Sequence, residues 1–365
     1  MNKLEKGIKV LQILNSNSFE GYIVGGAVRD YLLGNPLNDI DITTNASLDD
    51  ISKMFDNVEM KGSKYLGCRI IYLDEEFEVT MFRKDIEYID HRHPTTVVAE
   101  TIEQDLVRRD FTINAFAMNS DYEIIDLFNG KEDLSNRLIK TIGDANVRFN
   151  EDAIRVLRAL YFSSKLNFDL DNQIIECFNQ DYLKYLKEEY IKDMFFKILS
   201  FESKKGLEYI VKYNVFKNHS FYQRLAELAF KYDVYDNLYA LYILKNGELP
   251  SMTLITKKEK SKALDINYLI SNEFNNISLF YGNMDILEEA ILLWNKISDI
   301  KYSLEDITSR YERLAIHNIK EINFDFNLID QSRRSDITKE IVINILNGNV
   351  KNNNNDEIKN FLGVV

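Results

Sequence analysis

The periodicity of apolar residues changes near residue 132, and this change limits the possible folds more than any other feature of the chain. Before it, short alternating apolar stretches predict strands separated by short helices, because successive side chains of a strand point to opposite faces. After it, apolar residues recur with the 3.6-residue period of amphipathic helices. We therefore expect an α+β protein in which a small sheet-containing domain precedes a long helical extension.

Individual elements of the first part are predicted from short segments. Leucine and isoleucine residues recur on one face of an expected helix over residues 3–15. AVRDYLLG predicts a helix closed by Gly34, and CRIIYL and EFEVTMFR predict adjacent strands. Residues 84–105 have little periodicity and predict a mobile loop. Near the other end, NGNVKNNNNDEIKN is low in complexity and is predicted to be flexible.

The segment NDIDITT places two aspartates on one face of an expected strand. Because residues i and i+2 of a strand face the same side, Asp39 and Asp41 project together while Ile40 and Ile42 point into the core. Glu78 in EFEVTMF is a candidate third carboxylate. Neighbouring carboxylates raise each other's pKa, and a hard divalent cation such as Mg²⁺ removes that cost. A metal site and an ordinary solvated strand face both remain open at this point.

Two adjacent glycines, Gly25 and Gly26, follow an expected strand and precede the helix that holds Arg29. Glycines let backbone N–H groups approach an anion closely, a helix N-terminus favours phosphate, and Arg29 adds a positive charge. The dinucleotide-binding fingerprint G-x-G-x-x-G is absent from VGGAVRD, and the helical second half lacks the further β–α units of that fold. The segment therefore favours a phosphate site over an NAD-binding fold.

Composition excludes several classes of protein. The formal net charge of −13 argues against a broad affinity for nucleic acid, which needs a basic face, but leaves room for a local basic groove. The two cysteines, Cys68 and Cys177, make a disulfide framework or a cysteine-based zinc site implausible. The N-terminal sequence is unlike a signal peptide, and no apolar run approaches the roughly 18–20 residues of a membrane span. These features predict a cytoplasmic protein without a membrane or disulfide partner.

Three segments occur in one order along the chain: GGAVRDYLLGNPLNDIDITT, RRDFTINAFAMN and GDANVRFNEDAIRVLRALYFSSKLNF. Together they resemble the class II tRNA nucleotidyltransferases and bacterial poly(A) polymerases of the DNA polymerase β-like superfamily. The resemblance covers the first half of the chain. It implies a nucleotidyltransferase head with a small mixed or antiparallel sheet over residues 1–131. An all-helical neck for nucleobase recognition (132–203), a helical body (204–275) and a tRNA-binding helical tail (276–365) would follow.

The first two segments carry the reaction in the resembling family. Its aspartates that match Asp39 and Asp41 hold two Mg²⁺ ions, one activating the RNA 3′-hydroxyl and the other clamping the triphosphate. Glu78 remains a possible third carboxylate. The resemblance implies contacts to the nucleotide's phosphates and sugar for Gly25, Gly26, Arg29, Arg108, Arg109, Asp110 and Asn114.

The third segment, NEDAIRVLRAL, admits two interpretations. Asn150 is a suitable N-cap, and Glu151 pairs with Arg155 at i,i+4, which would explain these residues as an ordinary helix start. In the resembling family, the residues matching Asp152 and Arg155 form a protein template. The aspartate accepts from the exocyclic amine of cytosine or adenine, and the arginine donates to the ring nitrogen beside it. Guanine and uracil present the reverse order. Glu151 would orient the arginine, and Arg158 belongs to the same group.

A later helix departs from the family pattern. EEYIKDMFFKIL resembles a segment usually written E-R-I-x-x-E, but Tyr190 stands where arginine is expected and Asp193 replaces glutamate. The family's segment supports the template helix rather than taking part in the chemistry.

The choice among related activities depends on the rest of the chain. Poly(A) polymerases of this group carry basic extensions, whereas this chain is acidic, which favours addition of C, C and A from CTP and ATP to the 3′ end of tRNA. The loop over residues 84–105 matches the mobile loop that full CCA addition needs. Poly(A) synthesis, addition of CC or A alone, and a non-catalytic RNA-binding module are the alternatives. The segment TKKEKSK is either a solvated loop or a tRNA contact through Lys257, Lys258, Lys260 and Lys262.

Overall fold

Contacts divide the chain into two compact units, Met1–Gln223 and Arg224–Val365, each with buried apolar residues of its own. The finer division into head, neck, body and tail stays a prediction. The computed structural model of the chain describes residues 1–60, 66–88, 90–92, 94–251, 254–353 and 355–363.

The first unit contains a mixed sheet. Its strands are β1 (Gly21–Val24), β2 (Asp41–Thr44), β3 (Val58–Met60), β4 (Gly67–Tyr72), β5 (Glu75–Met81), β8 (Phe116–Met118) and β9 (Ile124–Asp126). They follow the order β3-β4-β5-β2-β1-β8-β9, in which β2 and β5 are parallel and the other neighbours antiparallel. The β4–β5 pair confirms the predicted pairing of CRIIYL with EFEVTMFR.

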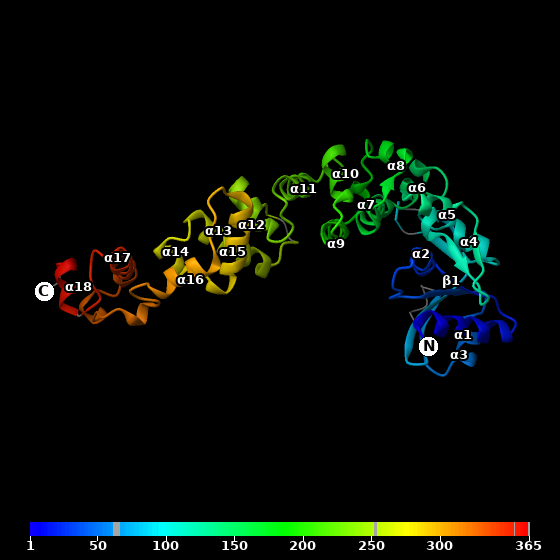
Figure 1. Cartoon of the computed structure of the whole chain (residues 1–365), viewed down its shortest axis with the longest axis horizontal. Helices are drawn as coiled ribbons and strands as arrows, with labels where there is room; N and C mark the ends of the chain where they lie inside the picture. The colour runs from blue at the N-terminus through cyan, green and yellow to red at the C-terminus, as the bar shows by residue number, and fades with distance from the viewer. Residues whose placement is uncertain (61–65, 89, 93, 252–253, 354, 364–365) are drawn as a thin grey trace. The chain divides into compact units, whose positions relative to one another are not determined.

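One face of the sheet is covered by α1 (Lys3–Ser16) and α3 (Leu48–Met54), which lie on the same side of it (Figure 1). Leu11 of α1 and Ile42 of β2 are both fully buried in this core. The predicted helix over residues 3–15 is confirmed, and Asn2 caps it with a capping box.

The opposite face carries a smaller apolar cluster. Ile102 and Leu106 of α4 (Ile102–Val107) pack there with Val24 of β1 and Ala117 of β8. This face is only partly covered, and side chains that leave the sheet on this side near β2 reach a cavity.

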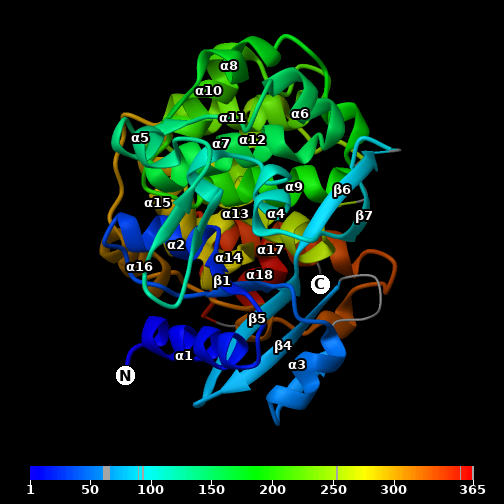
Figure 2. The same ribbon diagram turned by 90° about the vertical axis from the view of Figure 1, so that its right-hand side faces the viewer.

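The segment over residues 84–105 is mostly regular structure, so the prediction of a mobile loop is wrong. β6 (Arg83–Tyr88) and β7 (Pro94–Val98) form an antiparallel hairpin that extends next to the helical part of the unit (Figure 2). Residues 89 and 93 lie outside the described residues. The pairing was not visible in the sequence because its strands are polar and lack a clean apolar alternation.

The rest of the first unit is mainly helical. Its further elements are α2 (Gly26–Leu32), η1 (Thr112–Asn114), α5 (Gly130–Ser135), β10 (Leu138–Ile139), α6 (Ala145–Glu151), α7 (Ile154–Leu166), β11 (Asp169–Leu170), α8 (Asn172–Cys177), η2 (Leu183–Tyr185), α9 (Glu188–Leu199) and α10 (Lys205–Tyr213). The short parallel pair β10–β11 interrupts the predicted all-helical neck. Asn150 is not an N-cap: it lies inside α6, which Asp144 caps, and α7 begins only after Ala153.

The second unit is helical throughout its described ranges. Its elements are α11 (Ser220–Tyr232), which begins in the first unit, α12 (Leu238–Asn246), α13 (Lys257–Ser271), α14 (Asn276–Tyr281), η3 (Met284–Ile286), α15 (Leu287–Ile297), α16 (Leu304–Glu312), η4 (Ile319–Glu321), η5 (Phe326–Leu328), α17 (Arg334–Leu346) and α18 (Asn355–Leu362). Over the described residues of both units, every helix is too short or too polar to cross a bilayer. Cys68 and Cys177 are buried free thiols.

The asparagine-rich segment near the C-terminus is bound to its surroundings rather than flexible. Asn352 donates to the backbone O of Glu321 and accepts from the backbone N of Asn323, both at 2.7 Å. The segment then continues into α18. Residue 354 lies outside the described residues. Low complexity was misleading because asparagine side chains satisfy backbone groups of a neighbouring turn.

Gly206 provides a test of the packing between α7 and α10. A Cβ at this position would lie 2.3 Å from the backbone O of Leu160 and 2.7 Å from Ser164 Oγ. Because the backbone atom cannot swing aside, we expect Gly206→Ala to lower the free energy of unfolding by about 2 kcal/mol. Gly7→Ala is the matched control, since the nearest atom there is a side-chain methyl 3.3 Å away. Urea unfolding measures both variants, and equal losses would contradict the expectation.

Candidate active site

A cavity of about 740 Å³ in the first unit collects residues that are far apart in the sequence. It brings together the predicted carboxylates, the predicted phosphate and sugar contacts, and the predicted template residues. Glu151 does not line it but is bonded to Arg155, which does. The predicted residues that line the cavity are Gly25, Gly26, Arg29, Asp39, Asp41, Glu78, Arg108, Arg109, Asp110, Asn114, Asp152, Arg155 and Arg158.

Strand pairing explains why the carboxylates meet. Asp41 of β2 is the register partner of Glu78 in β5, so the two side chains leave the same face of the sheet. Ile40 and Ile42 alternate with the aspartates and are buried on the other face. Asp39 lies two residues before the start of β2, outside the strand, and lines the same cavity as Asp41.

The donor set fits a hard divalent cation. Asp39, Asp41 and Glu78 offer only carboxylate oxygens, and all three also line a second cavity of about 410 Å³. Within the described part of the chain, no group of three or more acidic, histidine or cysteine side chains is arranged to hold a metal by itself. Mg²⁺ commonly binds through one or two carboxylates and completes its shell with water and substrate phosphates, so an open acidic pair suits it.

The Arg29 side chain is only 2% exposed, and hydrogen bonds hold its guanidinium in place. Its Nη1 donates to Asn114 Oδ1 at 2.6 Å, and its Nε and Nη2 donate to the Asp30 carboxylate at 3.0 and 2.9 Å. Asn114 donates to Asp110 Oδ1 at 3.2 Å, and Arg158 Nε donates to Asp110 Oδ2 at 2.6 Å. These contacts, which we call the Arg29–Arg158 network, connect α2 through η1 to α7.

Burial alone would raise the pKa of Asp110. The Arg158 guanidinium and the hydrogen bonds from Asn114 and the backbone N–H of Phe111 outweigh that effect and hold the pKa below its ordinary value. Asp110 therefore stays ionised and keeps Arg158 in the cavity.

Two features of the structure require glycine at position 25: the backbone conformation there and the close approach of the Arg109 side chain. The Gly25 φ of 69° lies in the left-handed region, and a Cβ there would be 2.9 Å from Arg109 Nη1. A side chain at this position would therefore displace the arginine that the cavity needs.

Asp105 was missed by the sequence analysis and positions two predicted arginines. It is fully buried, and its Oδ1 accepts from Arg108 Nε and Nη2 at 3.0 and 2.9 Å. Its Oδ2 accepts from Arg109 Nη2 at 3.0 Å. Burial raises the pKa of Asp105, but the two guanidinium groups outweigh it and hold the pKa below its ordinary value. The i,i+3 and i,i+4 spacing on α4 was the available signal.

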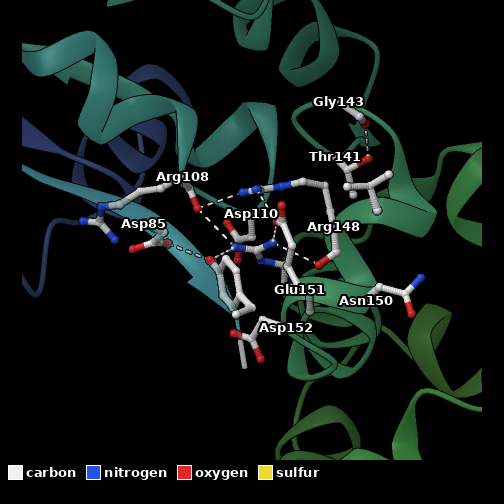
Figure 3. Close-up of polar contacts among 12 residues, drawn as sticks. Asp85, Arg108, Asp110, Thr141, Gly143, Arg148, Asn150, Glu151 and Asp152 are labelled. Atoms are coloured by element: carbon white, nitrogen blue, oxygen red, sulfur yellow. Dashed lines mark hydrogen bonds and ion pairs between the residues drawn. The ribbon is translucent and has the colours of Figure 1, made fainter. Parts of the chain in front are cut away.

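The predicted base-recognition residues lie at a break between two helices (Figure 3). Glu151 ends α6, Asp152 is its extended C-cap, and Arg155 belongs to α7. Glu151 accepts from Arg155 Nη1 at 2.8 Å, which confirms the predicted pair, and from Arg148 Nη1 at 2.5 Å. Arg148 also donates to the backbone O of Arg108 at 2.8 Å, which ties α6 to the end of α4.

The β6–β7 hairpin supplies three further residues that sequence analysis missed. Arg155 Nη2 donates to the Tyr88 hydroxyl at 3.0 Å, and Tyr88 donates to Asp85 at 2.6 Å. Arg92 Nη1 donates to Asp152 Oδ1 at 3.0 Å. No local spacing connects these residues, so the sequence offered no signal for them.

The predicted tRNA-contacting lysines belong to the second unit and form the start of a helix rather than a loop. Thr256 caps this helix, α13, with a capping box through Glu259. Lys262 pairs with Glu289 at 2.6 Å. The exposed lysines are Lys257, Lys258, Lys260 and Lys262.

Comparisons with known proteins agree with this site. Residues 21–140 match the family described as Poly A polymerase head domain. The CCA-adding enzyme of Staphylococcus aureus (strain Newman) is 31% identical over 97% of this chain and 96% of its own length. The chain belongs to the CCA-adding enzymes. The predicted resemblance and the assignment as a nucleotidyltransferase are thereby confirmed.

Solved structures of CCA-adding enzymes share the fold. The Bacillus stearothermophilus CCA-adding enzyme in complex with CTP has a TM-score of 0.74 and 25% identity, covering 96% of this chain and 95% of that one. The Thermotoga maritima CCA-adding enzyme complexed with tRNA_CCA has a TM-score of 0.58 and 17% identity, covering 99% and 94%. The α+β fold with a sheet-containing head is confirmed.

The charge of Asp105 makes a pH-dependent prediction. Its folded-state pKa lies below its ordinary value of 3.8, so its stabilisation is present above that value and is lost as the pH falls through the folded-state pKa. We expect Asp105→Asn to lower the free energy of unfolding by about 3 kcal/mol at about pH 7, because two partly buried guanidinium groups lose a fully buried partner. The loss should shrink at about pH 3.

Urea unfolding at both pH values measures this difference. Asp121→Asn, an exposed aspartate in the turn after β8, is the control and should change little. A loss of equal size at both pH values would show that shape rather than charge is responsible.

Proposed function

We propose that this chain adds C, C and A from CTP and ATP to the 3′ end of tRNA and releases pyrophosphate at each addition. The observation that carries the proposal is a single cavity that joins Asp39 and Asp41 to Asp152 and Arg155. A carboxylate pair for phosphoryl transfer thus faces the same space as a donor–acceptor pair for a nucleobase. The similarity to an enzyme in complex with CTP supports this choice of substrate.

Asp39 and Asp41 would hold two Mg²⁺ ions, with Glu78 as a possible third carboxylate. When bound, these ions would lower the pKa of the RNA 3′-hydroxyl and neutralise charge on the transferred phosphate and the pyrophosphate. The β2–β5 pairing fixes Asp41 beside Glu78, so the ligands would be oriented before the substrate arrives.

Arginines from two elements would bind the triphosphate. Arg29 from α2 and Arg108 and Arg109 from the end of α4 line the cavity with fixed positive charge. Asp105 and Asn114 hold them through hydrogen bonds, so little side-chain freedom remains to be lost on binding.

Asp152 and Arg155 would select the base. The Asp152 carboxylate would accept from the exocyclic amine of cytosine or adenine, and Arg155 would donate to the adjacent ring nitrogen. Uracil and guanine would place a carbonyl against the carboxylate and leave buried groups unsatisfied. Glu151 would orient Arg155, and Arg158 would complete the group through Asp110.

The second unit would contact tRNA. Lys257, Lys258, Lys260 and Lys262 at the start of α13 are exposed cations in an acidic chain, as a localised phosphate contact requires. We assign nucleotidyl transfer to residues 1–131, base recognition to 132–203, and a body and tail to 204–275 and 276–365. Because its substrates are tRNA, CTP and ATP, we expect the enzyme to work in the cytoplasm.

Extension of a tRNA that lacks its 3′ CCA tests the function. With Mg²⁺, we expect C addition from CTP alone and complete CCA addition from CTP with ATP. Asp41→Asn should reduce the rate by about a thousandfold, because several kcal/mol of metal stabilisation are lost. Asp74→Asn, in the β4–β5 turn, is the control and should retain full activity.

The same assay distinguishes the alternatives. Long A tracts on unstructured RNA would indicate poly(A) synthesis, and products that end at CC or need a CC-ended acceptor would indicate partial addition. No incorporation by the wild-type chain would refute the proposal.

Arg155→Ala tests the template assignment separately from the metal site. We expect the preference for CTP over UTP, measured as the ratio of kcat/KM values, to fall by about tenfold or more because a base-edge contact is removed. The Mg²⁺ concentration needed for half-maximal rate should stay the same, since Asp39 and Asp41 are unchanged. Retention of the full CTP preference by a folded Arg155→Ala variant would contradict the template role.

A further inference from the structure

The β6–β7 hairpin is docked at the break between α6 and α7. His91 Nδ1 lies 2.6 Å from the backbone O of Asn150, and the backbone N of Ala153 donates to the backbone O of His91 at 2.9 Å. The His91 ring stacks on Tyr185 with 3.9 Å between centroids. The hairpin therefore contacts the backbone on both sides of Asp152.

Arg92, the next residue of the hairpin, connects Asp152 to Tyr190 of α9. Its Nη1 donates to both carboxylate oxygens of Asp152, at 3.0 and 3.3 Å. Its guanidinium carbon lies 4.8 Å from the centroid of the Tyr190 ring, within the range of a cation–π contact. Arg92 thus links the Asp152 carboxylate to α9.

Asp152 depends on this support because its own segment holds it weakly. It is a C-cap with φ −139° and ψ 102°, outside both helices. The hydrogen bond within its own segment runs from the backbone N of Ile154 to Oδ1 at 3.2 Å. A carboxylate on an extended residue between two helices has several open rotamers unless another group fixes it.

Arg92 binds Asp152 from outside the described lining of the cavity. Asp152 and Arg155 line the cavity, whereas neither Arg92 nor Tyr190 is among its described lining residues. Because an ionised carboxylate has about four lone-pair sites, Asp152 can accept from a base amine while Arg92 stays bound. The arrangement orients the carboxylate without blocking it.

We propose that Arg92 and Tyr190 are positioning residues for base selection. Tyr190 fixes the plane of the Arg92 guanidinium, and Arg92 fixes the Asp152 carboxylate in the orientation that accepts an exocyclic amine. This inference rests on the proposed function of the cavity. It gives a role to the tyrosine at position 190, where the resembling family has arginine: the positive charge beside Asp152 comes from the hairpin instead of α9.

Full-length Arg92→Ala, Tyr190→Leu and Tyr190→Phe test the proposal, with tRNA lacking its 3′ CCA, Mg²⁺, and CTP or UTP. We expect the ratio of kcat/KM for CTP over UTP to fall by about tenfold in Arg92→Ala, because Asp152 loses a charge-assisted partner. In Tyr190→Leu it should fall by about threefold, as for loss of an exposed cation–π contact. Tyr190→Phe keeps the ring and should behave as wild type.

The double variant Arg92→Ala with Tyr190→Leu shows whether Tyr190 acts through Arg92 or affects base selection independently of it. Since Tyr190 acts through Arg92, the double variant should lose no more discrimination than Arg92→Ala alone. Additive losses would overturn the assignment of Tyr190. Tyr122→Leu, a tyrosine that is 43% exposed in the β8–β9 turn, is the matched control and should keep wild-type discrimination.

Three results would overturn the positioning role in an active enzyme. The first is unchanged discrimination in Arg92→Ala and Tyr190→Leu. The second is an equal loss of kcat/KM for CTP and UTP, which indicates a merely structural contact. The third is tighter CTP binding with unchanged discrimination, which indicates that Arg92 competes with the base.

A wild-type chain that incorporates neither nucleotide overturns the proposed function itself, which is a different outcome. Tyr190 is 38% exposed, so its variants fold even where Arg92→Ala does not.

Discussion

Mutual repulsion among arginines is the constraint on which this cavity depends. A site for a triphosphate needs several guanidinium groups in one small space, and those groups repel one another until the substrate arrives. Buried carboxylates offset the repulsion: Asp105 lies between Arg108 and Arg109, and Asp110 binds Arg158. Each carboxylate points its partner toward the cavity while staying out of the metal-binding group. Although the net charge of the chain is negative, the arginines thus give this cavity a local positive electrostatic potential.

The positions of the carboxylates depend on a different feature, the alternation of side chains between the two faces of a strand. β2 buries its isoleucines against α1 and α3, so its aspartates face the open side of the sheet. The parallel pairing with β5 then sets Glu78 beside Asp41 without any contact between the carboxylates being needed. The carboxylates are placed by backbone pairing, whereas the arginines are placed by side-chain ion pairs. A substitution in the sheet core and one in the arginine cluster would therefore disturb the site in different ways.

Local sequence patterns made much of the candidate site predictable. The isoleucine–aspartate alternation, the glycine pair at the start of α2 and the Glu151–Arg155 pair are all visible within a few residues of sequence, and the structure confirms them. The order of three segments then identified the family and the fold.

The contacts that sequence reasoning missed connect distant segments. Arg92 and Asp152 are 60 residues apart, and Arg155 and Tyr88 are 67 apart. Their hairpin carries no periodic apolar signal in the sequence, so it was predicted to be a loop. The helix break had the same cause: Glu151, Asp152 and Arg155 fit one continuous helix equally well in the sequence, whereas the structure interrupts it at the extended Asp152.

The Arg29–Arg158 network joins two tasks that are usually treated as separate. Arg29 in α2 and Arg158 in α7 share one unbroken series of hydrogen bonds through Asn114 and Asp110. Under the proposed function, a base that tilts α7 would also move Arg29 beside the phosphates. An incorrect nucleotide would then be held with its phosphorus out of line, so slow bond formation rather than weak binding would reject the error.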